Sequence, residues 1–449
     1  MRKLFGTDGI RAVAGEPPLD AKTIYAVGMA LAHQLKTGAA QPSVILGMDT
    51  RESGSWIAAV LSAGLTKAGA TVQSAGVITT PAIAYLARKH GFSAGVVISA
   101  SHNPWHDNGI KVFGGDGYKL PDATELRIEE EIFRQLESVA APDVAKLSAP
   151  HVNEKFRADY EAFLLSAVPH LELNGLKLVL DCANGAASAI APELFARLGG
   201  KVHFTHVHPN GRNINAECGA LHPAVVAAET KAHRADIGVT FDGDADRALF
   251  ADANGNVVNG DAVLLLAARD LKARNLLHGD IVVATTMSNM GLEAALRRDA
   301  IKMLRAPVGD KYVLEMMQAN SASLGGEQSG HILFPHLATT GDGLLTALVV
   351  LDVIRRAGKP LHELISDLKV FPQVIVNVRV KEKKPLDTIA TVAASIRDAE
   401  DALKANGRVV IRYSGTEPLA RVMIEAESEE VMRRHADAIA GAIRDALGA

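Results

Sequence analysis

The chain has 449 residues, a formal net charge of −4, 48% hydrophobic residues and only 4% aromatic residues. Because the net charge gives no global basic field, we expect no nucleic-acid partner. The chain has only two cysteines, Cys182 and Cys218, which argues against a disulfide framework and favours a cytoplasmic location. We expect no membrane association, because no secretory signal is visible and apolar runs such as 262–268 are too short to span a bilayer. At roughly 150 residues per domain, the length predicts about three domains.

The chain opens with the segment 5–11 (FGTDGIR), a loop interrupted by glycines that ends in a cation. Glycines let the backbone bend closely around a ligand, and Arg11 can pair with a phosphate. A helix is predicted over 20–35, and a recurring order of strand, helix, strand, helix, strand begins near residue 44.

Three units share this order. Their predicted elements are strands over 44–47, 71–77 and 95–98 with helices over 56–67 and 81–89; strands over 176–180, 201–205 and 237–241 with a helix ending near 198 and another over 223–233; and strands over 281–284 and 301–305 with helices over 292–298 and 311–318.

Each unit ends in a loop rich in reactive side chains: 99–104 (SASHNP), 242–247 (DGDADR) and 325–331 (GGEQSGH). Alternating strands and helices predict parallel α/β sheets with right-handed crossovers, and ligands in such folds bind beyond the carboxyl ends of the strands. We therefore expect the three loops to converge on one cleft.

The C-terminal segment has a different pattern. Its predicted elements are strands over 374–380, 408–413 and 419–425 and helices over 386–403 and 429–447. Strands joined by a tight loop favour an antiparallel α+β domain that acts as a lid, rather than a fourth copy of the α/β unit.

Ser101 is the candidate nucleophile, because it follows a buried strand in an exposed loop. The hexapeptide 99–104 is also typical of a simple turn. Lys111 lies on a second strand that returns from the loop, where its ammonium group could move a proton or balance phosphate charge, unless it is only an exposed lysine. His102 is a weaker candidate base, because adjacent side chains of an extended chain point apart.

The loop 242–247 places three carboxylates close together directly after a strand. Such carboxylates repel one another unless a cation neutralises them, and oxygen ligands without Cys or His favour Mg²⁺. The alternatives are a structural loop of the calcium-binding kind and a solvated acidic turn. Arg247, the next residue, could face either a carboxylate or a substrate phosphate.

Two further loops have the composition of ligand-binding sites. The loop 327–331 (EQSGH) can hydrogen-bond a polyol, although His331 could be a structural histidine. The loop 412–418 (RYSGTEP), with Arg421 beyond it, has amides, hydroxyls and guanidinium groups suited to a phosphate dianion, or it is a hairpin with surface arginines.

One region is rich in zinc-ligand residue types. These are His203, His206, His208, Cys218 and His222. Their spacing fits no common zinc pattern, and the sequence Pro-Asn-Gly at 209–211 is typical of a turn, so we do not expect a zinc site.

Taken together, the four loops resemble those of the α-D-phosphohexomutase family, in the same order and spacing over essentially the whole chain. The segments 5–11, 99–111 and 210–219, together with Gln328, most resemble the branch of the family that acts on amino sugars. The expected fold class is three similar α/β domains with mixed, largely parallel sheets and a C-terminal α+β domain like the TATA-box-binding protein, around one central cleft.

The expected domains carry the four loops in turn. Their boundaries are 1–150 for the phosphoserine loop, 151–253 for the metal loop, 254–368 for the sugar loop and 369–449 for the phosphate loop. The candidate catalytic residues are Ser101, Lys111, Arg11 and His331. The candidate ligands of Mg²⁺ are Ser101, Asp242, Asp244 and Asp246. The candidate substrate-binding residues are Arg247, Glu327, Ser329, Arg412, Ser414, Gly415, Thr416 and Arg421.

The resemblance implies an isomerase in which phosphorylated Ser101 converts a hexosamine 6-phosphate into its 1-phosphate through a bisphosphate, toward activated N-acetylglucosamine and cell-wall polymers. Hexosamine or glucose 1,6-bisphosphate is the expected primer, and a homodimer is possible. The alternatives are a glucose- or mannose-phosphate mutase, a metal-dependent phosphatase, and a phosphosugar-binding regulator without turnover.

Overall fold

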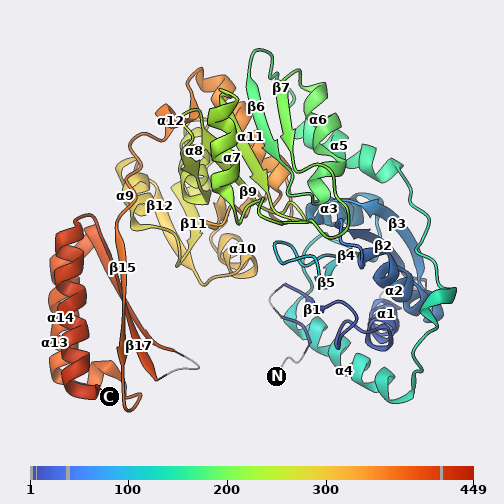
Figure 1. The fold of residues 1–449 in the computed structure, drawn as a ribbon, viewed down its shortest axis with the longest axis horizontal. Coiled ribbons are helices and arrows are strands. Elements are labelled where there is room, and N and C mark those ends of the chain that lie inside the picture. The colour runs from blue at the N-terminus through green and yellow to red at the C-terminus, as the bar shows by residue number, and fades with distance from the viewer. Residues whose placement is uncertain (1–3, 7, 37–40, 415–417, 449) are drawn as a thin grey trace. The chain divides into compact units, whose positions relative to one another are not determined.

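A computed structural model of the chain describes residues 4–6, 8–36, 41–414 and 418–448. The chain forms two compact units, one of Met1–Thr286 with Leu304–Leu364 and the other of Met287–Met303 with Ile365–Ala449. Figure 1 shows the helices and strands of each unit.

The first sheet has the strand order β1-β5-β4-β2-β3. Its strands are β1 (Ile10–Val13), β2 (Ser43–Met48), β3 (Thr71–Val77), β4 (Ala94–Ile98) and β5 (Asp107–Gly114). β3, β2 and β4 run parallel, whereas β5 runs antiparallel to β4 and β1 antiparallel to β5. This mixture places the loop after β4 at the point where the chain turns back.

Helices pack on both faces of the first sheet. They are α1 (Ala21–Lys36), α2 (Gly54–Lys67), α3 (Thr80–His90) and α4 (Asp122–Ser138). Apolar side chains of α1, α2 and α4 share one core with β2 and β4. On the other face, Cβ atoms at Gly47 and Gly95 would lie 2.6 and 2.7 Å from the side chain of Ile83, so the two glycines allow α3 to lie close to the sheet.

The second and third sheets repeat this arrangement, with strand orders β10-β9-β8-β6-β7 and β12-β11-β13-β14. In each sheet, the strand before the reactive loop lies between the first strand of that α/β repeat, which runs parallel to it, and a return strand that runs antiparallel to it. The strands are β6 (Lys177–Asp181), β7 (Lys201–Thr205), β8 (Ile237–Phe241), β9 (Ala248–Asp252), β10 (Val257–Val258), β11 (Ile281–Thr285), β12 (Lys302–Ala306), β13 (Gly325–Gly326) and β14 (Ile332–Leu333). The prediction of three similar α/β units with mixed sheets is confirmed.

Helices alternate with the strands of these two sheets, and those over 155–167, 260–273, 343–357 and 361–364 were not predicted from the sequence. The helices are α5 (Lys155–Ala167), α6 (Ala191–Arg197), α7 (Pro223–Ala232), α8 (Gly260–Ala273), α10 (Asp310–Ala319), α11 (Gly343–Ala357) and α12 (Leu361–Leu364).

The second compact unit contains a three-stranded antiparallel sheet with the order β15-β17-β16. Its elements are β15 (Gln373–Arg379), α13 (Ala390–Leu403), β16 (Gly407–Tyr413), β17 (Leu419–Ala426) and α14 (Glu429–Leu447). Both helices share a core with one face of this sheet, which confirms the predicted α+β segment. The helix expected over 386–403 begins only at Ala390, because Ile389 is extended after a short 3-10 turn.

Helix α9 (Met290–Arg298) packs within the second compact unit, although by sequence order it belongs to the third α/β repeat. The Asn289 side chain and the Phe371 backbone exchange two hydrogen bonds of 3.1 and 2.8 Å. The Met290 amide donates to Glu425 Oε1 at 2.8 Å, and Glu425, 1% exposed, also pairs with Arg408. The N-terminus of α9 is thereby fixed to the C-terminal sheet.

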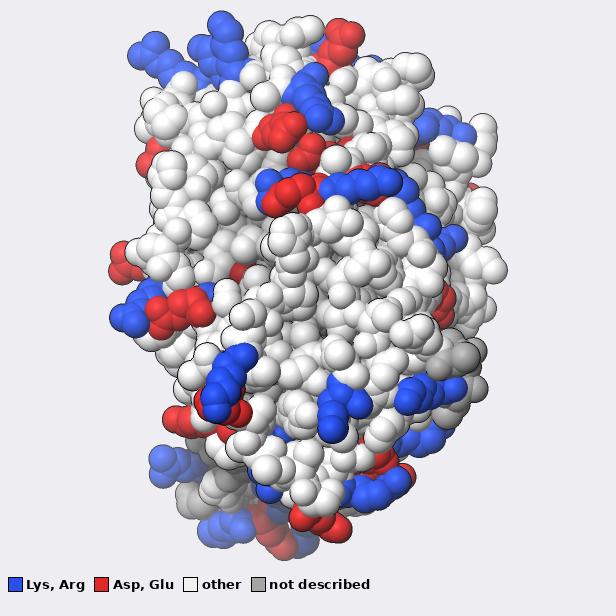
Figure 2. Space-filling view, turned by 90° about the vertical axis from the view of Figure 1, so that its right-hand side faces the viewer, with Lys and Arg blue, Asp and Glu red and all other residues white. Residues whose placement is uncertain are grey.

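The molecular face shown in Figure 2 carries Lys and Arg side chains close to Asp and Glu side chains around a largely uncharged centre. That face therefore presents no field of a single sign. Among the helices of the described ranges, none combines the length and the apolar character needed to cross a membrane.

Candidate active site

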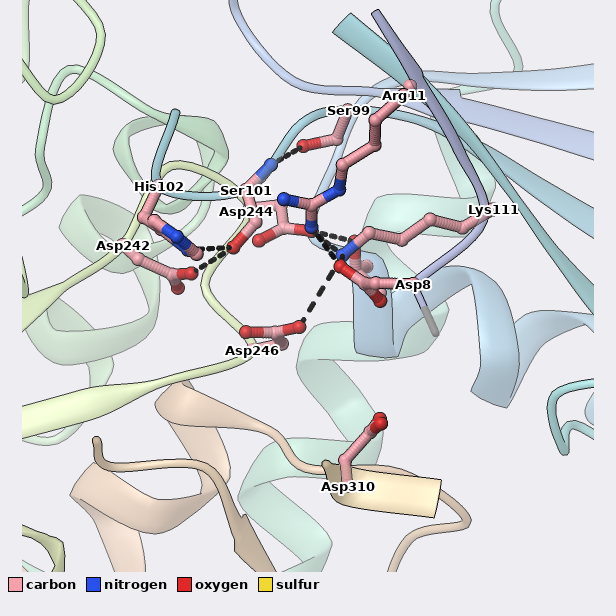
Figure 3. A network of polar contacts seen from close by, with 12 residues as sticks. Asp8, Arg11, Ser99, Ser101, His102, Lys111, Asp242, Asp244, Asp246 and Asp310 are labelled. Atoms are coloured by element: carbon pink, nitrogen blue, oxygen red, sulfur yellow. Dashed lines mark hydrogen bonds and ion pairs between the residues drawn. The ribbon is translucent and has the colours of Figure 1, made fainter. Parts of the chain in front are cut away.

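Ser101 lies in the turn between β4 and β5 and is 1% exposed. Its backbone is left-handed, with φ of 52°, and its amide donates to Ser99 Oγ at 2.9 Å. Ser99 Oγ in turn donates to Asp49 Oδ2 at 2.6 Å. The Ser101 hydroxyl donates to Asp242 Oδ2 at 2.6 Å, so it faces the acidic loop after β8 (Figure 3).

The three carboxylates of that acidic loop, Asp242, Asp244 and Asp246, are buried, and one oxygen of each lies within 4.8 Å of the others. Burial and the charges of Asp246 and Asp244 raise the pKa of Asp242. Burial also disfavours ionised Asp246, but Lys111 and then His331 outweigh it and lower the pKa of Asp246. The loop therefore concentrates negative charge that its protein neighbours neutralise only in part.

The donor set of this loop suits a hard divalent cation. Asp244 Oδ1 is buried, and no hydrogen-bond donor of the described chain reaches it. Buried polar atoms are rarely left without a partner, and carboxylate oxygens are the ligands that Mg²⁺ prefers. The three aspartates therefore have the chemistry of a magnesium site.

Lys111 is 2% exposed on β5, with Nζ 2.8 Å from Asp244 Oδ2, 3.1 Å from Asp8 Oδ2 and 3.6 Å from Asp246 Oδ2. Burial alone would lower the pKa of Lys111, but the charges of Asp244 and Asp8 raise it well above its ordinary value. The side chain is therefore a fixed positive charge among the carboxylates rather than an exposed lysine.

Asp8 is a member of this network that sequence reasoning did not single out. It forms ion pairs with Arg11 and Lys111 (Figure 3) and also with Lys119. These three cations, of which Lys111 has the largest effect, outweigh burial and lower the pKa of Asp8. Lys119 also lies 2.7 Å from Asp310 Oδ2. The position of Asp8 in the glycine loop that carries Arg11 was the available sequence signal.

His331, between β13 and β14, joins the same network and is 3% exposed. Nδ1 lies 3.7 Å from Asp246 Oδ1, and Nε2 lies 3.7 Å from Asp310 Oδ2. Burial would lower the pKa of His331, but Asp246 and then Asp310 raise it to about 9. The Gly341 amide donates to Nε2 at 3.2 Å, which favours the neutral ring and so opposes the effect of the two carboxylates on this pKa.

His102 lies closer to the nucleophile than sequence reasoning allowed. Its Nδ1 atom is 3.3 Å from Ser101 Oγ, so the expectation that the ring points away is wrong. The left-handed turn at Ser101 brings the two adjacent side chains together, which an extended chain would not do. Burial and the nearby Arg247 lower the pKa of His102, which favours the neutral ring.

Glu327, Ser329 and Arg247 line the same region. Glu327 accepts from the Gly309 amide at 3.1 Å and from Ser329 Oγ at 3.2 Å. The Arg247 guanidinium lies 3.4 Å from His102 Nδ1 and 3.8 Å from Asp246 Oδ1. Loops from all three α/β repeats thus contribute side chains to one polar network.

The predicted phosphate loop belongs to the second compact unit. Arg412 on β16 lies directly opposite Arg421 on β17, so both side chains leave the sheet on the face away from α13 and α14. Ser414 is buried, and Lys383 Nζ donates to its carbonyl oxygen at 2.6 Å. The candidates Gly415 and Thr416 lie outside the described residues.

The possible zinc ligands do not form one cluster. His206 Nδ1 lies 3.0 Å from Asp181 Oδ1, near Cys218, whereas His203 stacks on His233 with 3.8 Å between ring centroids. Burial and then Asp181 raise the pKa of the Cys218 thiol to about 12.

Four family models match the chain in succession. They are described as Phosphoglucomutase/phosphomannomutase alpha/beta/alpha domain I over residues 2–138, domain II over 158–255, domain III over 259–371 and the C-terminal domain over 375–442.

Individual proteins are similar over the full length. A protein of Koribacter versatilis named phosphoglucosamine mutase is 59% identical over 454 residues, which cover 100% of this chain and 98% of the relative. A phosphoglucomutase/phosphomannomutase family protein from Burkholderia thailandensis has a TM-score of 0.78 at 24% identity, covering 98% and 97% of the two chains. The N-acetylphosphoglucosamine mutase of Aspergillus fumigatus, solved with GlcNAc-6P and magnesium, has a TM-score of 0.60 at 19% identity, covering 99% and 96%.

Proposed function

The chain belongs to the phosphoglucomutase/phosphomannomutase family, and we propose that it is an isomerase that interconverts glucosamine 6-phosphate and glucosamine 1-phosphate. The observation that carries the chemistry is the buried 2.6 Å hydrogen bond from Ser101 Oγ to Asp242. The choice of an amino sugar rests on the phosphoglucosamine mutase of K. versatilis, which matches over the whole chain.

We propose that Ser101 carries a phosphoryl group in the active enzyme, primed by hexosamine or glucose 1,6-bisphosphate. The phosphorus–Oγ bond breaks as the free sugar hydroxyl attacks phosphorus, Oγ keeps the electron pair, and the hydroxyl proton passes to the protein. The bisphosphate then turns, and its other phosphoryl group passes back to Oγ. Neither water nor free phosphate is consumed, so the net reaction moves one phosphate between two positions of the sugar.

Asp242, Asp244 and Asp246, together with an oxygen on Ser101, are the proposed ligands of Mg²⁺. The buried Asp244 Oδ1 atom, for which the described residues supply no donor, supports this set. When bound, the ion supplies positive charge to the phosphoryl oxygens. Lys111 and Arg11 add fixed positive charge beside the carboxylates, which offsets the roughly two negative charges of phosphoserine.

His331 is the proposed proton donor to the sugar oxygen, and the catalytic role proposed for Lys111 is that of the fixed positive charge described above. Asp246 and then Asp310 raise the pKa of His331, which favours a protonated ring that can donate to an oxygen that gains charge. His331 stands in the same loop as Glu327 and Ser329, which we propose bind sugar hydroxyls. This proximity supports proton transfer next to the place where the sugar is held.

Arg247 is a proposed substrate-binding residue of the first compact unit, and the loop after β16 in the second unit is proposed to bind a phosphate of the substrate. In that loop the candidates are Arg412, Ser414, Gly415, Thr416 and Arg421. Arg412 and Arg421 lie directly opposite each other on adjacent strands, so two guanidinium groups leave the same face of the sheet, which supports a phosphate site there.

The remaining parts of the proposal concern organisation. We propose domain boundaries at 1–150, 151–253, 254–368 and 369–449, a cytoplasmic location and a possible homodimer. The product would enter the synthesis of UDP-N-acetylglucosamine and, from it, peptidoglycan precursors.

The deciding experiment measures turnover of glucosamine, glucose and mannose 6-phosphates by wild-type protein and by Ser101→Ala. We expect the highest kcat/KM with glucosamine 6-phosphate, and a loss of about 10⁴-fold or more in the variant, since no other group can carry the phosphoryl group. Near-normal turnover by Ser101→Ala would contradict the phosphoserine mechanism. A preference for glucose or mannose phosphate would change the substrate, release of inorganic phosphate would indicate a phosphatase, and binding without turnover would indicate a regulator.

A further inference from the structure

The serine turn is held by side chains from two segments far apart in the chain. Building on the proposed function, we propose that Asn215 is a positioning residue that, together with Arg51, fixes the Ser101 turn so that its hydroxyl faces Asp242. Asn215 lies in the segment 210–219, which the resemblance singled out and which the proposed mechanism does not use.

The turn at Ser101 needs such support. With φ of 52°, Ser101 occupies the left-handed region that side-chain-bearing residues other than Asn and Asp rarely adopt. A strained backbone of this kind persists only where surrounding contacts determine it. On its amide side the turn is bonded to Ser99, and the Asn103 amide donates to the Ala100 carbonyl oxygen at 3.1 Å, but neither bond holds the carbonyl oxygen of Ser101.

Two donors hold the carbonyl side. Asn215 Nδ2 donates to the carbonyl oxygens of Ser101 and Asn103 at 2.9 and 3.1 Å. Arg51 Nη2 donates to the same two oxygens at 3.1 and 2.5 Å. Arg51 is 3% exposed and Asn215 is 9% exposed, so water competes little for these bonds. Arg51 precedes the turn in the sequence and Asn215 follows it, so two distant segments hold the same pair of carbonyl oxygens.

Asn215 is itself held in place. Its backbone is left-handed with φ of 57°, a conformation that Asn tolerates better than most residues, and its amide donates to the Ala183 carbonyl at 2.9 Å. These restraints fix the direction of the side-chain amide.

The acidic loop 242–247 packs against the contact between the Asn215 side chain and the Ser101 turn. A Cβ atom on Gly243 would lie 2.6 Å from the Ser101 carbonyl oxygen and 2.9 Å from Asn215 Nδ2. Only glycine therefore lets the backbones of the two loops approach this closely. The Asn215 amide lies where the serine turn meets the metal loop, so it sets the spacing between Ser101 Oγ and Asp242.

This role has a kinetic signature. Asn215 bonds the turn through two carbonyl oxygens and belongs to neither the sugar-binding nor the phosphate-binding set, so its loss should leave KM unchanged. A looser turn should lower kcat and should change how often the phosphoryl group on Ser101 is lost to water, which yields serine and inorganic phosphate. Loss of overall stability alone would change neither KM nor the ratio of hydrolysis to turnover.

The test compares wild-type protein with Asn215→Gly and Asn213→Ala. Glycine keeps the left-handed backbone unstrained and removes only the amide, whereas Asn213 is a matched control that bonds His208 and Asn210 within its own loop. We expect Asn215→Gly to lower kcat by about 10- to 100-fold, as for the loss of two buried hydrogen bonds, with KM within about twofold of wild type. Intact mass over time should show faster loss of phosphate from Ser101, and Asn213→Ala should match wild type.

Asn215→Asp provides a second variant if the glycine variant does not fold, because it keeps the shape and the backbone preference but lacks the donor. Wild-type kcat and phosphoserine lifetime in both variants would overturn the role of Asn215, and so would an equal loss in Asn213→Ala. A wild-type protein without mutase turnover would contradict the proposed function instead, so the two failures are distinguishable.

Discussion

The serine site and the arginine pair of the C-terminal sheet are both suited to phosphate, but they are built in opposite ways. Ser101, Lys111 and the three aspartates are buried in a network in which almost every group has a charged or hydrogen-bonding neighbour. Arg412 and Arg421 lie directly opposite each other on a small antiparallel sheet, on the face away from α13 and α14.

This difference separates two tasks. Transfer of a phosphoryl group requires atoms held at fixed distances, because small misplacements of the reacting atoms are costly. Capture of a phosphate requires mainly positive charge and adaptable donors. We therefore expect changes at the buried site to lower kcat and changes at the arginine pair to raise KM.

Of the changes that compare the two sites, removal of divalent cations should have the largest effect. Three buried carboxylates without a cation would repel a phosphoryl group on Ser101, so treatment with a chelator should lower kcat by about 10³-fold or more. Added Mg²⁺ should restore turnover, as measured by conversion of glucosamine 6-phosphate. Full activity after the chelator has been shown to remove all bound metal would contradict a metal site at Asp242, Asp244 and Asp246.

Substitution of the arginine pair should have a smaller effect of a different kind. Arg412→Ala should raise KM for the sugar phosphate by about 10- to 100-fold through loss of a charge-assisted hydrogen bond, with kcat changed much less. Arg433→Ala is the control, because Arg433 lies exposed on α14 and pairs with Glu429 one turn away on the same helix. If Arg412→Ala lowered kcat and left KM unchanged, the proposed division between transfer and capture would fail.

A third test separates burial from catalysis. Asp342 is 2% exposed and accepts a 2.7 Å hydrogen bond from Tyr160, and burial raises the pKa of Asp342 from 3.8 to about 6. Folded protein thus holds this proton more tightly than unfolded protein does, so Asp342 stabilises the fold at low pH, and that contribution is lost as the pH rises through about 6. By proton linkage the loss amounts to about 3 kcal/mol.

Asp342→Asn should therefore gain stability relative to wild type between about pH 4 and pH 6, measured as the free energy of unfolding in denaturant. Asn can still accept the Leu345 amide that Asp342 Oδ1 caps, and turnover should stay within about twofold. Parallel pH curves for the two proteins would mean that Asp342 does not titrate in this range.

Much of the fold was predictable because its strands have strong apolar patterns. The bounds of β3, β7, β8 and α14 agree with prediction to the residue. Strand β13 has only two residues, and its pairing with β11 depends on tertiary contacts that periodicity does not report. The placement of α9 in the C-terminal unit likewise depends on contacts between distant segments.

The candidate site divides in the same way. The sequence revealed which residue types follow each strand, so Ser101, the three aspartates and His331 could be named. It could not reveal that Ser101 has a left-handed backbone, which brings His102 beside the hydroxyl, or that Asn215 reaches the serine turn. Such features arise from contacts over more than 100 residues of chain or from a single backbone angle.

The attachment of α9 to the C-terminal sheet also limits how this family can be recombined. A chimaera joined near residue 369 would take the C-terminal sheet from one relative and α9 from another, although Glu425 bonds the first amide of α9 and Phe371 bonds Asn289. The exchangeable module is therefore discontinuous. It comprises Met287–Met303 together with Ile365–Ala449, and two separate stretches of gene would have to be inherited together.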